Sequence, residues 1–498
     1  MSDFIIFSFR EFFAMFKAKT NKKSFFLSEG YPLLTFALIV FGYFTKLELY
    51  TIILNTLLVC VAILQTKSIK PFLFYVLTFM YQMNPAHMPQ KPYHSDYFYT
   101  GYPLYLILGT AAILVVCVII FMFRSHIFVG VNWRKLPLLI PLIIFSVSML
   151  TNGLLYEGNN LPDFLWGAGQ VFVYLILYLL LYLGLRGEDG EELSKYFSYL
   201  TILMSWILIL EVGELFVFGN AIEGGTIIRG RVVLGFGNCN IVGAHAAMLI
   251  PINFYGFIKG KYPYLSLVTA VFIYLVALAS TSRNAMLFGS IYFVVFFAIA
   301  LFYVLRGVDK KTILKMFGGF AVFAIAFVAI FWDQLNIIIQ LYLNRGMGDS
   351  GRYSLWRQCF DHFLNNPIFG RGFYSLDIYT PNSFDSFSFD LVPDFAHNTV
   401  FELLGATGIV GFIGYSIYRI STLVLAFYRT SKERFLLVAG ASLIVMASLL
   451  DNYIFQIFGP VYYTVALVIA GKIYEREMEI WNKKDLPKVH IKSLKVNL

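Results

Sequence analysis

Long apolar runs separated by short polar segments make up most of the chain. Each run approaches the roughly 20 residues that an α-helix needs to cross a bilayer, and none alternates apolar and polar residues as the strands of an outer-membrane barrel do. The pattern predicts an all-α, polytopic membrane protein of twelve to fourteen spans, because two runs are short. The expected spans are 31–45, 47–64, 71–83, 102–123, 136–150, 164–185, 196–218, 242–258, 263–279, 285–305, 313–332, 398–428, 434–450 and 456–474.

These spans divide the chain into five regions. The first interleaves Phe with Lys and Arg, as expected for a helix lying on the anionic inner leaflet. The loop over 333–396 is much longer than the other connections, and loops of such length inside a compact fold are usually functional. The regions are a cytoplasmic interfacial helix over 1–30, membrane helices over 31–332, a large extracytoplasmic loop over 333–396, membrane helices over 397–474 and a cytoplasmic tail over 475–498.

Composition and charge support this organisation. The chain is 59% hydrophobic and 13% charged, whereas a soluble domain carries about 25% charged residues. If the N-terminus is cytoplasmic, all but nine of the 38 Lys and Arg residues fall in cytoplasmic segments, as the positive-inside rule requires. The net charge of +9 therefore reflects membrane topology and not nucleic-acid binding, and both termini are expected in the cytoplasm.

The outward basic residues run against this bias, and seven of the nine are Arg. Arg presents a planar fork of donors that suits phosphate or carboxylate. Pairing with acids of the loops would explain any single one of them, but a set clustered around one large loop predicts an anion site. The nine are Lys46, Lys91, Arg229, Arg231, Arg283, Arg345, Arg352, Arg357 and Arg371.

The large loop contains one expected helix and ends at a histidine. Residues 351–361 are expected to be helical, with an apolar stripe formed by Trp356, Cys359, Phe360 and Phe363. His397 begins the helix that re-enters the membrane, where a neutral imidazole can accept a proton. A lone boundary histidine is more often structural, but here it shares the outer face with the arginines.

Other chemistry finds little support in the sequence. His87 and His94 have no ligand partner at zinc spacing, and no phosphate-binding Gly-rich motif occurs, so no metal and no cofactor is expected. A lipid-linked oligosaccharide flippase or other transporter is an alternative of a different class. A transporter should carry ionisable residues at mid-span, and only Glu211 and Glu214 approach that description.

Three motifs carry a resemblance to a known family. They are G-R-x-x-x-W from Gly351, N-P-I-F-G-x-G from Asn366, and H-N-T-V-F-E-L-L-G-A-T-G-I-V-G from His397. In this order and on one face, they resemble the bacterial O-antigen ligase and polymerase membrane family (Wzy type). His397 and Gly408 enclose ten residues, as in the H-x10-G spacing of the ligase branch. The resemblance is dense from about 225 to 415 and includes Arg229-Gly-Arg231 and Thr281-Ser282-Arg283.

This resemblance implies a GT-C-like fold and a metal-independent glycosyltransferase that acts on glycans carried by undecaprenyl pyrophosphate at the outer face of the cytoplasmic membrane. A polysaccharide polymerase is expected, with a ligase onto lipid A core as the alternative. The implied partners are the lipid-linked glycan, the bilayer, a chain-length regulator and a flippase. The expected roles are catalysis by His397 and Arg283, pyrophosphate binding by Arg283 with Arg229 or Arg231, and substrate positioning by Arg352, Arg357, Arg371, Asn398 and Glu402.

Overall fold

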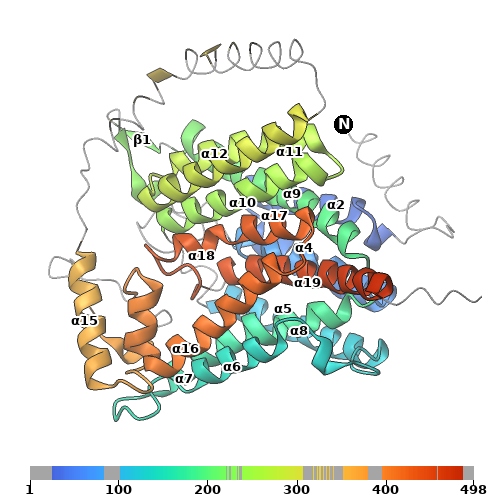
Figure 1. The fold of residues 1–498 in the computed structure, drawn as a ribbon. Helices are drawn as coiled ribbons and strands as arrows, with labels where there is room; N and C mark the ends of the chain where they lie inside the picture. The colour runs from blue at the N-terminus through green and yellow to red at the C-terminus, as the bar shows by residue number, and fades with distance from the viewer. Residues whose placement is uncertain are drawn as a thin grey trace, which may run out of the picture.

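The computed structural model describes four long stretches of the chain. They are residues 25–83, 101–306, 351–378 and 395–485, apart from 220, 224–225, 233, 235–237 and 457, together with single positions between 318 and 340. The interfacial helix expected at the N-terminus, most of the span expected at 313–332, much of the large loop and the end of the tail lie outside the described residues. The described part is a bundle of packed helices (Figure 1).

The first half of the bundle is entirely helical. Its elements in chain order are η1 (Phe25–Leu27), α2 (Gly30–Thr45), α3 (Glu48–Thr66), α4 (Lys70–Gln82), α5 (Gly101–Arg124), η3 (Trp133–Lys135), α6 (Leu139–Leu150), α7 (Leu161–Val171), the π-helical turn η4 (Phe172–Ile176), α8 (Leu177–Gly184) and α9 (Gly190–Val217).

The second half adds a two-stranded hairpin, in which Ile222 pairs with Ile227 and Glu223 with Thr226 in antiparallel register. The elements are β1 (Ile222–Glu223), β2 (Thr226–Ile227), η5 (Arg229–Arg231), α10 (Cys239–Lys259), α11 (Pro263–Ala279), α12 (Arg283–Leu305), α15 (Arg352–Asn365), η7 (Tyr374–Leu376), α16 (Thr399–Phe427), α17 (Lys432–Ala441), α18 (Leu443–Ala447) and α19 (Phe458–Asp485).

Local signals in the sequence account for many helix ends. α7 begins with a capping box, in which the Asn160 side chain accepts from the Asp163 N–H and the Asp163 side chain accepts from the Asn160 N–H. The Asp189 side chain caps α9 by accepting from the N–H groups of Glu191 and Glu192. α11 begins at Pro263, which has no N–H to leave unpaired in the first turn. Most described helices coincide with the expected spans to within a few residues, but α9 begins earlier, α19 continues to Asp485, and the expected span 434–450 is divided into α17 and α18.

Seven of the described helices are long and apolar enough to cross a membrane. They are α3, α5, the continuous α7–η4–α8 unit, α9, α10, α12 and α16. α4 and α6 have 13 and 12 residues, which is too short to cross a hydrocarbon core of about 30 Å at 1.5 Å per residue. The short runs noted in the sequence are thus short helices.

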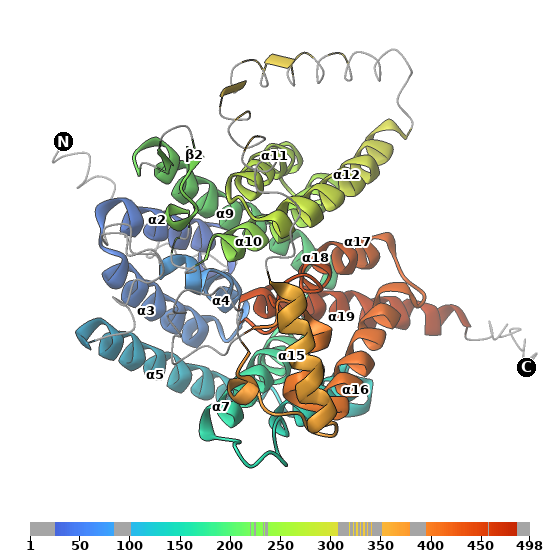
Figure 2. The same cartoon turned by 90° about the vertical axis from the view of Figure 1, so that its left-hand side faces the viewer.

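Burial separates central helices from peripheral ones. α10 is 89% buried over its membrane-length window, whereas α5 and α12 are 22% buried. α10 packs against α9, α11, α12 and α17, and it lies near the middle of the bundle when the molecule is turned (Figure 2). A helix that is apolar all round is suited to such a central position, and the exposed apolar faces of α5 and α12 are suited to lipid.

α16 is interrupted at Gly408, whose backbone angles (φ 62°, ψ −160°) are non-helical. At this break the segment that follows α15 docks onto α16 by backbone hydrogen bonds. The N–H groups of Ile409, Val410, Arg371 and Gly372 donate to the carbonyls of Pro367, Ile368, Gly405 and Ala406 at 2.9, 3.2, 2.9 and 2.9 Å, respectively.

Two glycines make this joint possible. A Cβ at Gly408 would lie 2.5 Å from the backbone carbon of Ile368, and a Cβ at Gly370 would collide with the backbone of Ala406. Both residues also have positive φ angles, which favour glycine. The glycines of the second and third sequence motifs therefore hold α15 against α16.

Candidate active site

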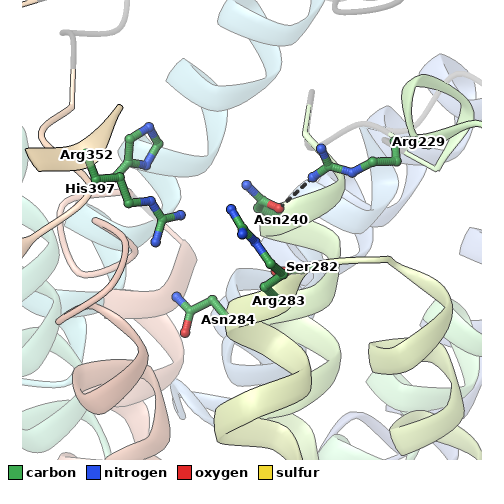
Figure 3. Close-up of a pocket in the computed structure, with 7 residues that line it drawn as sticks. All are labelled: Arg229, Asn240, Ser282, Arg283, Asn284, Arg352 and His397. Carbon is green, nitrogen blue, oxygen red and sulfur yellow. Dashed lines mark hydrogen bonds between the residues drawn. The ribbon is translucent and has the colours of Figure 1, made fainter. Parts of the chain in front are cut away.

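A polar pocket of about 170 Å³ lies between α10 and α12 on one side and α15 and α16 on the other (Figure 3). Segments far apart in the sequence meet there. None of the lining residues is acidic, and three are Arg, so the pocket favours an anion. Its lining residues are Arg229, Asn240, Ser282, Arg283, Asn284, Arg352 and His397.

Four helices begin at this pocket. Asn240, Arg283 and Arg352 lie in the first turns of α10, α12 and α15, and His397 directly precedes the cap of α16. The N-terminus of a helix carries a partial positive charge and directs backbone N–H groups outward. Four such termini add to the charge of the arginines, which is the arrangement by which proteins bind phosphate groups.

Arg229 is held in the pocket by two hydrogen bonds. Its Nε donates to Thr281 Oγ1 and its Nη2 donates to Asn240 Oδ1, both at 3.1 Å. Arg231, two residues later, points elsewhere and forms an ion pair with Glu223 of the hairpin at 2.8 Å. Of the two arginines between which the sequence left the choice open, Arg229 lines the pocket and Arg231 does not.

Packing of α15 on α16 carries Arg352 to the pocket. Arg352 follows Gly351, which is the N-cap residue of α15 and has a positive φ of 79°. One turn further, the ring of Trp356 stacks on Phe401 at 5.4 Å, and Trp356 Nε1 donates to the carbonyl of Ala396 at 2.9 Å. These contacts link Arg352 to the residue immediately before His397.

The apolar side of α15 differs in part from the expected stripe. Leu355 and Cys359 are buried, whereas Phe360 is 42% exposed. The expectation that Phe360 packs inward was wrong, because α15 contacts α16 along a narrow face centred on Cys359, next to Gly405.

His397 is paired with a buried carboxylate. Its Nδ1 lies 2.7 Å from Asp451 Oδ1, and the Asp451 side chain is 5% exposed. The backbone N–H of Asn452 also donates to that oxygen at 3.0 Å. Burial alone would raise the pKa of Asp451, but His397, the charge of Arg352 and the Asn452 N–H together hold that pKa below its ordinary value. Asp451 therefore stays ionised, and His397 Nε2 is left for a ligand.

Two residues expected to position substrate hold the backbone instead. Asn398 caps α16 by accepting from the N–H groups of Val400 and Phe401. Glu402 is fully buried; it accepts from the Ala396 N–H at 2.8 Å and from the side chain of Asn452. Neither lines the pocket, but Glu402 ties the residues before His397 to the segment that contains Asp451.

The other two loop arginines lie away from the pocket. Arg357 is exposed on α15. Arg371 lies over the ring of Tyr156 at 5.0 Å, and its Nη1 is 3.3 Å from His362 Nδ1. It also pairs with Asp377 at 3.8 Å. Burial and the adjacent Arg371 lower the pKa of His362, and this cluster is separate from the pocket.

Sequence reasoning missed four residues at or beside the pocket, which are Asn240, Ser282, Asn284 and Asp451. A signal for Asp451 exists, because Asp451-Asn452 is a polar pair at the outer end of the expected span 434–450. Within the described part of the chain, no three His, Cys, Asp or Glu side chains gather as metal ligands would.

Comparison with known proteins identifies the region around the pocket. Residues 268–416 match the family model described as O-antigen ligase, whereas no curated protein matches the chain significantly. The matched region includes Arg283, Arg352 and His397 from the pocket and the break at Gly408. Residues 268–416 are therefore similar to the O-antigen ligase family, in agreement with the resemblance seen in the sequence motifs.

Proposed function

We propose that this protein is a glycosyltransferase that moves a glycan from undecaprenyl pyrophosphate to a sugar hydroxyl at the outer face of the bacterial cytoplasmic membrane. The observation that carries the proposal is the pocket itself. Arg229, Arg283 and Arg352 converge at four helix N-termini beside the His397–Asp451 pair. An anion site next to a candidate base suits a reaction whose leaving group is a pyrophosphate.

The proposed step is a direct displacement at the anomeric carbon. The acceptor oxygen forms a bond to the anomeric carbon of the donor sugar while the bond from that carbon to the pyrophosphate oxygen breaks. The acceptor proton passes to His397 Nε2, and the pyrophosphate leaves with the electron pair. Preorganised cations stabilise the charge that gathers on this leaving group, and we assign this role to Arg283 and Arg229, without a divalent metal.

Asp451 supports the base in this scheme. Its carboxylate faces Nδ1 at 2.7 Å, so it orients the imidazole with Nε2 toward the acceptor and stabilises the imidazolium that forms. The positive charges of the arginines around the pocket disfavour a further positive charge on the His397 imidazolium. The buried Asp451 carboxylate offsets this repulsion. Arg352 is placed to contact either the pyrophosphate or the sugar next to it.

We favour a polymerase that joins O-antigen or capsular repeat units. A large loop that is rich in Asp and Phe and contains no Lys supports this choice. A ligase that moves the glycan to lipid A core is the second candidate, because the family model is described as O-antigen ligase and His397 and Gly408 have the spacing of that branch. In either case we place both termini in the cytoplasm, with a flippase and a chain-length regulator as candidate partners.

The test is transfer by the purified protein in lipid nanodiscs. Undecaprenyl-pyrophosphate-linked repeat units are supplied with EDTA present, and products are separated on a gel. A ladder of lengthening chains supports a polymerase, and transfer only to added lipid A core supports a ligase. We expect His397→Ala and Arg283→Ala each to reduce the rate by at least about 100-fold, whereas Arg231→Ala is the matched control.

Three outcomes count against the proposal. The first would be that the wild-type protein gives no transfer to any acceptor. The second would be that both His397→Ala and Arg283→Ala leave transfer unchanged. The third would be that activity disappears with EDTA and returns with a divalent cation. Movement of the lipid-linked glycan across a vesicle membrane without transfer would favour the transport alternative.

A further inference from the structure

Three aromatic side chains, contributed by α7, η7 and the segment before His397, form a partly exposed group. Trp166 of α7 lies 6.0 Å from the ring of Tyr374 and 6.2 Å from the ring of Phe395. All three residues are partly exposed. We call Trp166, Tyr374 and Phe395 the aromatic patch; the proposed chemistry described above does not use it.

The aromatic patch is connected to the segments that carry His397 and Asp451. Phe395 precedes His397 by two residues. Gln170, one helical turn after Trp166, donates from Nε2 to the carbonyl of Phe455 at 2.9 Å, and Phe455 follows Asp451 closely in the same loop. Phe373, the residue before Tyr374, also contacts the ring of Phe455 at 5.3 Å. All three members are therefore tied to the segments that hold the histidine and its carboxylate.

The aromatic patch and two of the three pocket arginines, Arg229 and Arg283, come from different parts of the chain, whereas Arg352 lies on the same side of the pocket as His397. α12, which begins at Arg283, lies in the upper part of both overall views, whereas α7 lies in the lower part (Figures 1 and 2). In the close-up, His397 and Arg352 face Arg229, Asn240 and Arg283 across the pocket (Figure 3). His397, two residues after Phe395, thus faces Arg229 and Arg283 across the pocket.

The aromatic patch is held in place before any ligand arrives. The Asp163 carboxylate is fully buried; it accepts from the N–H groups of Tyr374 and Ser375 at 2.6 and 3.1 Å and from Ser375 Oγ at 2.6 Å. These bonds anchor Tyr374 beside α7. Trp166 Nε1 has no acceptor among the described residues, and a buried donor without a partner is unfavourable.

We propose that the aromatic patch is the acceptor subsite, which binds a sugar ring of the acceptor glycan. This inference rests on the proposed function. A pyranose ring has an apolar C–H face that packs on an aromatic ring and hydroxyls that need polar partners, which is the mixed lining typical of ligand sites. The exposed amide of Asn160, beside Ser375, is a polar group near the aromatic patch.

The geometry fits the transfer reaction. The donor pyrophosphate occupies the pocket, the acceptor sugar stacks on the aromatic patch, and His397, which lines the pocket two residues after Phe395, can take the proton of the attacking hydroxyl. The aromatic patch has no formal charge, so it selects a neutral sugar ring and not a phosphorylated group.

The test separates acceptor binding from donor binding. In the nanodisc assay, acceptor and donor are varied independently for Trp166→Ala, Trp166→Phe and Tyr374→Ala. Phe164→Ala is the matched control, because Phe164 lies on the same helix and is 51% exposed. Hydrolysis of the donor, with water as the acceptor, is measured in parallel, and the melting temperature of each variant shows that it is folded.

We expect Trp166→Ala to raise the acceptor KM about tenfold, the effect of losing roughly 55 Å² of apolar contact. The donor KM and the rate of donor hydrolysis should stay within about twofold of wild type. Trp166→Phe keeps a stacking ring, so its acceptor KM should lie between those of wild type and Trp166→Ala. The repeat-unit oligosaccharide, freed from its lipid by mild acid, should inhibit wild-type transfer more strongly than Trp166→Ala transfer.

Two results overturn the inference without touching the proposed function. In one, wild-type transfer proceeds and Trp166→Ala leaves the acceptor KM unchanged. In the other, Trp166→Ala raises the donor KM instead, which assigns the aromatic patch to the lipid carrier or to the bilayer interface. Absence of both transfer and donor hydrolysis in the wild type counts against the proposed function itself.

Discussion

Replacing Asp451 by Asn tests the assignment of His397 most directly. The amide has nearly the same shape as the carboxylate, so packing changes little, but the negative charge beside the imidazole is lost. Asp451 does not line the pocket, and therefore its removal should leave substrate binding almost unchanged. The effect should appear in kcat, because the charge matters when His397 becomes an imidazolium.

The size of the effect follows from the geometry. A contact of 2.7 Å between Nδ1 and Oδ1 places the two charge centres about 4 Å apart, where the attraction is about 4 kcal/mol at an effective dielectric constant of 20. The His397 side chain is 36% exposed, and solvent screening reduces this value to roughly 2–3 kcal/mol. We therefore expect kcat to fall about 30- to 150-fold.

The measurement is the initial rate of transfer at saturating donor and acceptor. Asp451→Glu keeps the charge and should recover part of the rate. Glu223→Gln is the control, since it neutralises an outer-face acid whose side chain is 65% exposed and paired with Arg231. A kcat within about threefold of wild type for Asp451→Asn, or a large change in donor KM alone, would refute the assigned role.

Three further predictions follow from the same structure. Gly408→Ala should destabilise the fold by more than about 3 kcal/mol and lower its melting temperature, because the added Cβ would lie 2.5 Å from the Ile368 backbone. Gly169→Ala is the control, since its Cβ would meet open space. Equal melting temperatures for the two variants would contradict the role of Gly408 in joining α15 to α16. Arg229→Lys should reduce kcat/KM about tenfold through loss of the donor fork, whereas Arg231→Lys should not, and assays of both in parallel decide. Because the pKa of Asp451 is lowered in the folded protein, its carboxylate stabilises the fold at pH values above the ordinary carboxyl pKa. The difference in melting temperature between wild type and Asp451→Asn should therefore shrink as the pH drops below about 4. A difference that stays constant in acid would argue against the ion pair.

The helices were predictable from sequence because their causes are local. Apolar runs of membrane length, proline at the start of α11 and the capping box of α7 all act within a few residues, and most expected boundaries agree with the described helices. The exceptions are the start of α9, the division of one expected span into α17 and α18, and the end of α19. The expectation of a helix in the large loop was confirmed by α15. The face that α15 buries was only partly predictable, because it depends on contact with α16.

The candidate site shows where local information ends. The outward arginines could be selected from sequence because topology alone makes them unusual. Arg229 and Arg231 are two residues apart, yet the first faces the pocket and the second turns to Glu223. That difference arises from the hairpin and from Asn240, and no periodicity in the sequence records it.

The partner of His397 illustrates the same limit. Glu402 is near it in sequence and Asp451 is 54 residues away, yet Asp451 contacts the imidazole and Glu402 binds backbone and Asn452. Sequence by itself determined the apolar helices and the set of arginines suited to anion chemistry. The tertiary structure decided which of them meet, because contacts between distant segments depend on how whole helices pack and where breaks such as Gly408 allow them to join.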